Sequence, residues 1–464
     1  MSDLLYENKC GWDNVSDEEN EKIMNFANDY IDFMNKSKTE REIISSAKSM
    51  AEENGFRNIE DVQELHAGDK VYYINREKNI YLAVIGTDDI ANGINIIGAH
   101  ADSPRLDVKP NPLYQSGDLA YLNTHYYGGL KKYQWTTIPL AIHGVIVKEN
   151  GEKITVSIGE KDDEPVFVIT DLLPHLGRAQ MQKKLSEAIE GEKLDLAIGS
   201  KPQKADGDDK TDLIKKNIMK ILNQKYGITE EDFMSSELEI VPAFKARSMG
   251  FDSSMVASYG QDDKVCVYTS LRAILTIENP KRTAVCLFSD KEEIGSMGNT
   301  GMQSHVFDTF ISEILNKLNV NKTNLLDKVF CKSKMLSADV DAGVDPLYQD
   351  VSDLQNSGFI GHGISLNKYT GAGGKYDSSD ANAEFVGYIR RLFNQNSVKF
   401  QIAELGKVDA GGGGTIAYIL ADKGCDVIDC GVPVLSMHSP YEVTSKFDIY
   451  TAYKAYKAFF EKAE

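Results

Sequence analysis

The sequence predicts an α/β fold with a β-rich domain inserted into it. Helical periodicity opens the chain, and apolar runs typical of buried strands follow it. From about residue 107 to 241 the sequence changes to short β-like runs broken by glycine and asparagine, such as "IPLAIHGVIV" and "KITVSIG". A chain of 464 residues also exceeds what one hydrophobic core usually serves, so more than one domain is expected.

Two helices are predicted near the start of the chain. Ser16 and Glu19 form a capping-box pattern, and apolar residues recur after it at helical spacing. Thr39 and Glu42 repeat the signal. Gly55 is a suitable stop for the second helix, because glycine accepts the left-handed backbone that ends many helices.

The domain boundaries follow from these changes in pattern. We predict a catalytic α/β domain made of residues 1–106 and 242–464, with residues 107–241 as the inserted β-rich domain. The glycines of "DAGGGGTIAYILADKG" lack the Gly-Lys-Ser/Thr ending of a nucleotide loop. They therefore predict a tight turn into a helix over 415–421, facing the active-site edge of the sheet.

Four predicted strands end in acidic or imidazole side chains. The runs "INIIGAH", "TAVCLFS", "KMLSA" and "VIDCGVPVLSM" are each followed or closed by such residues. In an open α/β sheet, ligands gather outside the carboxyl ends of the strands, so these side chains are expected at one edge. They are His100, Asp102, Glu292, Glu293, Asp339 and His438.

With Asp262, these residues form the complete set of a two-metal hydrolase. Such a site needs carboxylates and imidazoles to hold two ions ~3.5–4 Å apart, and a free carboxylate to accept a proton from water. His100 and Asp102 lie on one face of an extended segment, so Asp102 can accept the second ring N–H of a metal-bound His100. Glu292 and Glu293 point in different directions, so one can bind metal while the other acts as general base.

Ordinary structural roles compete with this interpretation. The chain has 70 acidic residues, and glutamate pairs such as Glu18-Glu19 are usually surface charge. The pair Glu292-Glu293 differs because it follows a buried-strand pattern and precedes Gly295. His438 also fits a histidine satisfied within the core.

Six blocks of sequence closely resemble the aspartyl aminopeptidase family of dinuclear zinc exopeptidases. They are "GAHADSPRLDVKP", "DLLPHL", "YGQDDKVC", "SDKEEIGSMG", "SADVDAG" and "VLSMHSP", and they occur in the family's order from about Asn8 to the C-terminal helix. The resemblance implies a mixed-sheet zinc-exopeptidase domain whose inserted β-rich domain builds the subunit contacts.

The resemblance also implies a role for each residue. Asp262 would bridge both metals, with Asp263 as the alternative. Glu293 and His438 would complete one metal site, and His100 and Asp339 the other. Glu292 would be the general base and Asp102 the orienting acid.

Three further residues are candidates for substrate binding. His175 of "DLLPHL" matches a family histidine that reaches the active site of a neighbouring subunit, although a plain loop residue fits the sequence as well. Lys368 and Lys375 are candidates to pair with an acidic substrate side chain, with solvated loop lysines as the alternative.

The function expected is that of a metal-dependent aminopeptidase that hydrolyses the N-terminal peptide bond of peptides, with acidic N-terminal residues (Asp/Glu) as a candidate preference. The alternatives are a dinuclear-metal amidohydrolase that deacylates small amino-acid derivatives, and a non-catalytic assembly scaffold. Two divalent ions per chain are expected, Zn²⁺ first, although Co²⁺ and Mn²⁺ also accept nitrogen and oxygen ligands.

Composition sets the expected surroundings. A net charge of −19 disfavours nucleic acid as a partner. No apolar run reaches the ~20 residues of a membrane span, and the first residues lack a secretory signal, so a cytoplasmic location is predicted. The six cysteines show no CxxC spacing, so disulfides and thiolate zinc sites are not expected. The resemblance implies a homo-oligomer, the family's tetrahedral dodecamer.

Overall fold

The computed structural model describes residues 4–205, 210–320, 324–376 and 378–464. Contacts within the chain divide it into two units. The first comprises Met1–Asp102, Ala246–Met437 and Tyr441–Glu464. The second comprises Ser103–Lys245 and His438–Pro440. That residues 107–241 form a domain which builds the subunit contacts stays a prediction.

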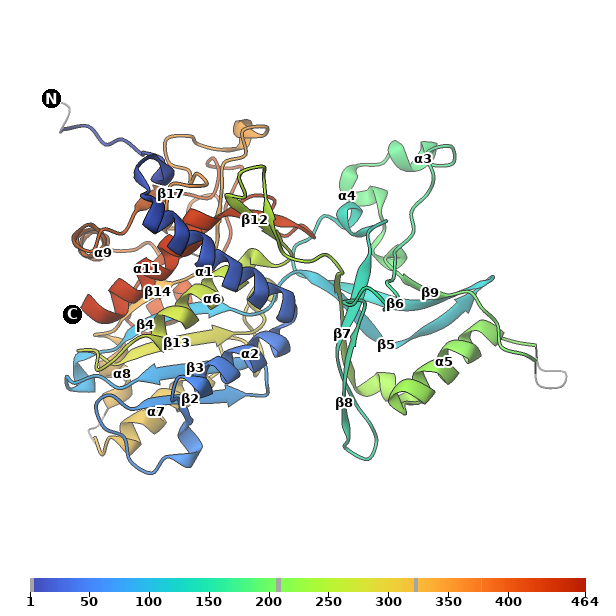
Figure 1. Cartoon of the computed structure of the whole chain (residues 1–464), viewed down its shortest axis with the longest axis horizontal. Helices are drawn as coiled ribbons and strands as arrows, with labels where there is room; N and C mark the ends of the chain where they lie inside the picture. The colour runs from blue at the N-terminus through green and yellow to red at the C-terminus, as the bar shows by residue number, and fades with distance from the viewer. Residues whose placement is uncertain (1–3, 206–209, 321–323, 377) are drawn as a thin grey trace. The chain divides into compact units, whose positions relative to one another are not determined.

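A nine-stranded mixed sheet forms the centre of the first unit (Figure 1). Strands β13, β4, β14 and β18 run parallel to one another, whereas β3 and β16 run antiparallel to their neighbours in this group. The mixed α/β class is therefore confirmed. In spatial order the strands are β1 (Arg57–Asn58), β2 (Lys70–Asn75), β3 (Asn79–Val84), β13 (Ala284–Ser289), β4 (Asn95–His100), β14 (Lys334–Ser337), β18 (Asp426–Gly431), β16 (Ile364–Asn367) and β17 (Phe400–Ala403).

Helices cover both faces of this sheet, because its central strands are apolar on both sides. In β4, Ile97 and Ala99 belong to one core cluster and Ile96 to the other. The first cluster packs against α1 (Asp17–Lys36), α2 (Glu40–Glu53), α6 (Gln261–Leu275), α9 (Ala383–Gln395) and α11 (Lys446–Lys462). The second packs against α7 (Val306–Lys317), α8 (Leu325–Phe330) and α10 (Ala417–Ala421).

The two N-terminal helices begin where their capping signals predict. The Ser16 side chain accepts a hydrogen bond from the Glu19 amide, and α1 starts at the next residue. Thr39 and Glu42 form a capping box at the start of α2. Gly55 follows α2 with a φ of 83°, the left-handed conformation that a helix stop requires. The helix predicted over 415–421 begins later, at Ala417.

The remaining strands of the first unit form two small sheets. One contains β11 (Arg247–Met249), β12 (Met255–Ser258) and β20 (Glu442–Ser445), and the other contains β15 (Asp341–Ala342) and β19 (Pro433–Val434).

The second unit is built on a six-stranded antiparallel sheet, in the region where short β-like runs predict a β-rich domain. The strand order is β8 (Lys153–Ile158), β7 (Leu140–Val147), β10 (Ser236–Pro242), β5 (Arg105–Ser116), β6 (Leu119–Tyr127) and β9 (Leu196–Gly199). Its helices are α3 (Arg178–Met181), α4 (Leu185–Ala188) and α5 (Leu213–Tyr226). Among the described residues of the chain, no helix has both the length and the apolar character needed to cross a membrane.

Candidate metal centre

Three parallel strands place acidic and imidazole side chains at one edge of the large sheet. Strand β4 ends at His100, which pairs with Ser289, the last residue of β13. On the other side of β4, Ser337 ends β14 shortly before Asp339. Since all three strands run in the same direction, the segments that follow them meet outside their carboxyl ends.

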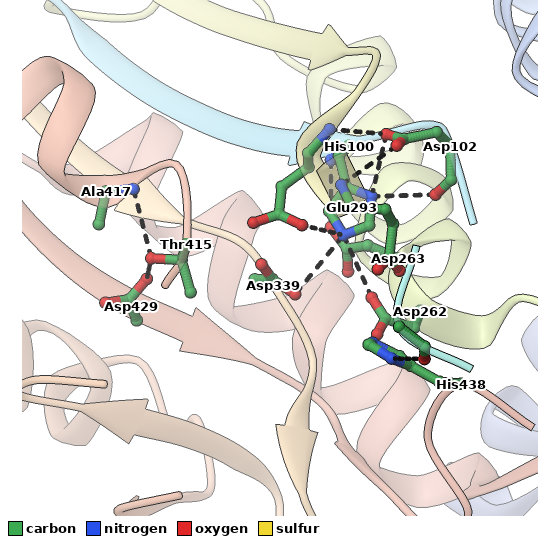
Figure 2. Close-up of polar contacts among 12 residues, drawn as sticks. His100, Asp102, Asp262, Asp263, Glu293, Asp339, Thr415, Ala417, Asp429 and His438 are labelled. Carbon is green, nitrogen blue, oxygen red and sulfur yellow. Dashed lines mark hydrogen bonds and ion pairs between the residues drawn. The ribbon is translucent and has the colours of Figure 1, made fainter. Parts of the chain in front are cut away.

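His100 is the centre of this group. Its side chain is buried, and its Nε2 atom lies 3.1 Å from Asp262 Oδ1 and 3.7 Å from Asp339 Oδ1 (Figure 2). Glu292 Oε2 lies 3.9 Å from the same nitrogen. One imidazole nitrogen therefore faces three carboxylates from three different segments of the chain.

Asp102 connects the other side of the ring to the loop that follows β13. His100 Nδ1 lies 3.4 Å from Asp102 Oδ1 and 3.0 Å from the Asp102 carbonyl oxygen. The two carboxylate oxygens of Asp102 also accept hydrogen bonds from the backbone amides of Glu292 (3.1 Å) and Glu293 (3.2 Å). Asp102 thus fixes both the imidazole ring and the backbone of the glutamate pair.

Asp262 and Asp263 face different parts of His100. Both have non-helical backbone angles at the start of α6. The Asp262 carboxylate approaches the ring, whereas Asp263 Oδ2 accepts a hydrogen bond from the backbone amide of His100 at 3.3 Å. Asp262 itself donates its backbone amide to Glu442 Oε2 at 3.1 Å. Of the two aspartates, Asp262 has the position that a ligand shared with His100 requires.

The carboxylates of the cluster hold protons unusually tightly. Burial is the largest of the causes that raise the pKa of Glu292 to about 8; the charges of Asp339, Asp102 and Asp262 contribute to the rise, and His100 opposes it. Burial also raises the pKa of Asp339, and that of Asp263 well above its usual range. Such shifts show that the negative charges repel one another in a dry environment.

The same carboxylates favour a positive charge at His100. Burial alone would lower the pKa of this imidazole, but hydrogen bonds to Asp102, Asp262 and Asp339 outweigh burial and raise the pKa well above 6.5. A cation among these groups, whether a proton or a metal ion, relieves the repulsion between the acids.

The geometry of the group fits a divalent metal. His100, Asp262 and Asp339 each offer one ligand atom, and these atoms lie within 4.8 Å of one another. Zinc with nitrogen and oxygen ligands at ~2.0–2.2 Å in a tetrahedron separates its ligand atoms by roughly 3.3–3.6 Å. One imidazole with carboxylates also suits Mn²⁺ and Co²⁺.

His438 lies in the second unit. It belongs to the short segment His438–Pro440, and its Nδ1 forms a 2.6 Å hydrogen bond with the carbonyl oxygen of Gly129. Because a carbonyl only accepts, Nδ1 carries the proton, and the neutral ring then has its lone pair on Nε2. Nε2 is the nitrogen that this tautomer presents to a metal.

Of the three substrate-binding candidates, one lies in the second unit and two lie in a single loop of the first unit. His175 is exposed in the second unit, in the segment that precedes α3. Lys368 forms an ion pair with Asp380 Oδ1, and Lys375 lies 2.9 Å from Asp380 Oδ2. Both lysines are therefore already paired with a carboxylate of the same loop.

The sequence patterns did not identify one polar group near the predicted helix 415–421. Thr415 Oγ1 donates to Asp429 Oδ1 at 2.7 Å and accepts from the Ala417 amide at 3.3 Å (Figure 2). Burial raises the pKa of Asp429 to about 7. A threonine just before a helix is a known cap, but no sequence pattern pairs it with an aspartate on a distant strand.

Comparison with known proteins gives a consistent result over the whole chain. The family model described as aminopeptidase I zinc metalloprotease (M18) matches residues 33–460. A probable M18 family aminopeptidase 1 from Clostridium acetobutylicum is 51% identical over 462 residues, which is 99% of each chain.

Solved structures agree in fold. An M18-family aminopeptidase from Thermotoga maritima superposes with a TM-score of 0.95 at 46% identity, covering 99% of this chain and 100% of that one. A dodecamer structure of mApe1 from S. cerevisiae, 20% identical, has a TM-score of 0.76 and covers 94% of this chain and 96% of that one; at this identity it shows the fold alone. The chain therefore belongs to the M18 family of zinc metallo-aminopeptidases, the aspartyl aminopeptidase family that its motifs resemble.

Proposed function

We propose that this M18 aminopeptidase binds two divalent metal ions and that Asp262 bridges them. One ion is held by His100 and Asp339 together with Asp262. The observation that supports this set is the convergence of the Asp262 and Asp339 carboxylates on Nε2 of the buried His100, with the three ligand atoms within 4.8 Å of one another. Asp263 is the weaker candidate for the bridge, because one of its oxygens accepts the His100 backbone amide.

Glu293 and His438 complete the ligand set of the second ion, together with Asp262. Glu293 is held through its backbone amide by Asp102, the residue that also contacts the His100 ring. For His438, the bond between Nδ1 and the Gly129 carbonyl provides the partner that metal-bound histidines usually have on their second nitrogen.

Bound metals polarise the scissile carbonyl of a peptide and lower the pKa of a water molecule. Glu292 then accepts the proton of that water and returns it to the leaving amine. Its surroundings suit this task, because burial raises the pKa of Glu292 and makes it a stronger proton acceptor than an exposed glutamate, while the charge of bound ions would favour the ionised form that accepts the proton. Asp102 keeps the His100 ring and the Glu292 backbone in fixed positions.

The proposed preference for peptides with an acidic N-terminal residue rests on Lys368 and Lys375. These cations are the ones that we propose for an acidic N-terminal side chain. Asp380 competes for both, and hydrogen bonds from Lys368 and Lys375 lower the pKa of its carboxyl. Asp380→Asn should therefore raise kcat/KM for peptides that begin with Asp relative to peptides that begin with Ala.

The active form that we propose is a homo-oligomer, the tetrahedral dodecamer of the family, in which His175 acts on substrate in a neighbouring subunit. Support comes from the exposed apolar side chains that surround this residue, Leu172, Leu173 and Leu176. The mApe1 structure from S. cerevisiae is described as a dodecamer.

A mass-spectrometric assay of free and N-acetylated peptides tests the activity. With zinc, the aminopeptidase should shorten free peptides by one N-terminal residue at a time and leave acetylated peptides intact. A chelator should abolish the cleavage. Release of acetate from N-acetylated amino acids, with free peptides intact, would instead establish the deacylase.

A further inference from the structure

The loop that follows β13 carries both Glu292 and Glu293, and its backbone is unusual. Lys291 and Ser296 have φ angles of 67° and 58°, in the left-handed region that residues other than glycine rarely adopt. A short 3₁₀ turn, Glu292–Ile294, lies between them. Such a backbone persists only where its surroundings hold it in place. Asp102 holds the middle of the loop, so the question is what holds its two ends.

The two ends are joined to each other by buried groups. Thr300 Oγ1 donates a hydrogen bond to Asp290 Oδ2 at 2.6 Å, and the Asp290 amide lies 3.4 Å from the Thr300 carbonyl oxygen. Asp290 and Thr300 are 1% and 3% exposed. This contact closes residues 290–300 into a ring with the glutamate pair inside it.

A hairpin far away in the sequence holds that closure. The Asn79 side-chain amide donates to the Thr300 carbonyl at 2.6 Å, and that of Asn75 donates to the Asn299 carbonyl at 2.8 Å. Asn75 also donates to Asn79 Oδ1 at 2.9 Å, since the two residues face each other across the β2–β3 pair. Asn79 is 0% exposed, so water does not replace these bonds.

We propose that Asn79, supported by Asn75, is a positioning residue for the hydrolysis. It fixes the Thr300 end of the loop and thereby sets the positions of Glu293, the proposed metal ligand, and Glu292, the proposed base. Asn79 is not one of the proposed metal ligands, and its side chain bonds to Asn75 and the Thr300 carbonyl. This inference rests on the proposed function of those two glutamates.

Asn79→Ala should weaken zinc binding at the more weakly bound site, lower kcat, or do both, by about the 10–100-fold typical of residues that orient metal ligands. KM should stay near the wild-type value. The zinc affinity is measured by competition with a chelating dye, and kcat with an aminoacyl-nitroanilide. Asn79→Asp should be at least as impaired, because it fills the same space but presents an oxygen to the Thr300 carbonyl.

Asn95→Ala is the matched control. Asn95 is also 0% exposed and donates its amide to a backbone carbonyl, that of Ala463 at 2.9 Å, but it lies at the start of β4, away from His100. The Asn95→Ala variant should lose as much thermal stability as Asn79→Ala and keep the zinc affinity and kcat of the wild type. Equal effects of Asn79→Ala and Asn95→Ala, or full activity of Asn79→Asp, overturn the proposal.

If Asn79→Ala does not fold, Thr300→Val decides the same question, because it removes only the hydroxyl that contacts Asp290 and should show the same losses. Wild-type zinc affinity and kcat in Thr300→Val would then overturn the proposal. Failure of the proposed function can be distinguished from failure of this inference. Absence of zinc-dependent aminopeptidase activity in the wild type would contradict the proposed function. Competition with the dye would still report whether Asn79 positions a zinc ligand.

Discussion

Adjacent acidic residues have different partners in this site. Asp262 approaches the His100 ring, and Asp263 accepts the backbone amide of the same residue. Glu292 approaches the ring nitrogen from the loop after β13. Because Asp262 and Asp263 contact different parts of His100, conservative substitutions at these neighbouring positions should have effects that can be distinguished from one another.

Glu292→Gln should keep its metals and lose turnover, because an amide has the shape of the carboxylate but accepts no proton. The expected fall in kcat is at least the ~10²–10⁴-fold of general acid–base catalysis. Metal content by elemental analysis should equal that of the wild type. Nearly normal kcat at full metal content would show that another group is the base.

Asp262→Asn should lose metal, because a neutral amide does not bridge two cations as a carboxylate does. Elemental analysis should give fewer than two ions per chain, together with a large fall in kcat. Asp263→Asn is the neighbouring control. Loss of metal in Asp263→Asn but not in Asp262→Asn would place the bridge one residue further along the chain.

Sequence patterns singled out candidate site residues but not the contacts between them. Strand-end positions singled out His100 and Glu292, since a buried apolar run followed by acid or imidazole is a local signal. The bonds from Asp102 to two amides of a distant loop left no such signal. Neither did the contact of Asn79 with Thr300, because both depend on how segments far apart in sequence pack.

At the scale of single elements, local chemistry explains where the two N-terminal helices begin. The caps at Ser16 and Thr39 were predicted because a side chain satisfies backbone amides within a few residues. The helix predicted from Thr415 starts at Ala417 instead, with Ile416 as its N-cap residue; the Thr415 hydroxyl accepts the Ala417 amide and donates to Asp429. That second bond is tertiary and was not predictable from the local sequence.

The first turn of α11 contains a buried acid that makes stability depend on pH. Asp448 accepts backbone amides from Gly361 (2.6 Å) and Gly363 (2.7 Å), yet burial raises its pKa to about 8. The carboxyl titrates near 3.8 when it is not perturbed. The folded state therefore binds this proton more tightly than the unfolded state, and the stability gained is lost as pH rises toward about 8.

The free energy of unfolding of the wild type, minus that of Asp448→Asn, should therefore fall between about pH 4 and about pH 8, by no more than about 1.4 kcal/mol per pH unit, and level off above that range. Denaturant titrations of both proteins at several pH values measure this difference. Subtracting the free energy of unfolding of the variant cancels the contributions of the other buried acids, which both proteins share. A difference that stays flat or grows with pH would mean that the two amides keep Asp448 ionised.

At the scale of the whole molecule, the second unit exposes apolar side chains around His175. Leu172 is 55% and Leu176 is 70% exposed. Clustered exposed apolar residues mark surfaces that associate with another protein. A second copy of the chain is the partner that the proposed oligomer supplies.

His175→Ala should lower kcat about tenfold or more without removing metal, because the residue acts on substrate and not on the ions. Light scattering should show the same oligomer as in the wild type. His305→Ala, at a histidine of the first unit whose side chain is 94% exposed, should leave kcat unchanged. A fully active monomer would refute the shared site, while the metal chemistry would stand.

The order of the strands has a consequence for how the protein is made. His100 ends β4, but more than half of the chain separates it from Asp339, its proposed fellow ligand after β14. A ribosome releases His100 long before Asp339, with the entire second sheet in between. Under the proposed ligand set, a nascent chain cannot hold the first ion until Asp339 has emerged, nor the second until His438 has emerged. Metal insertion is then a late event that follows the synthesis of most of the chain, and the two ions become bindable in a fixed order.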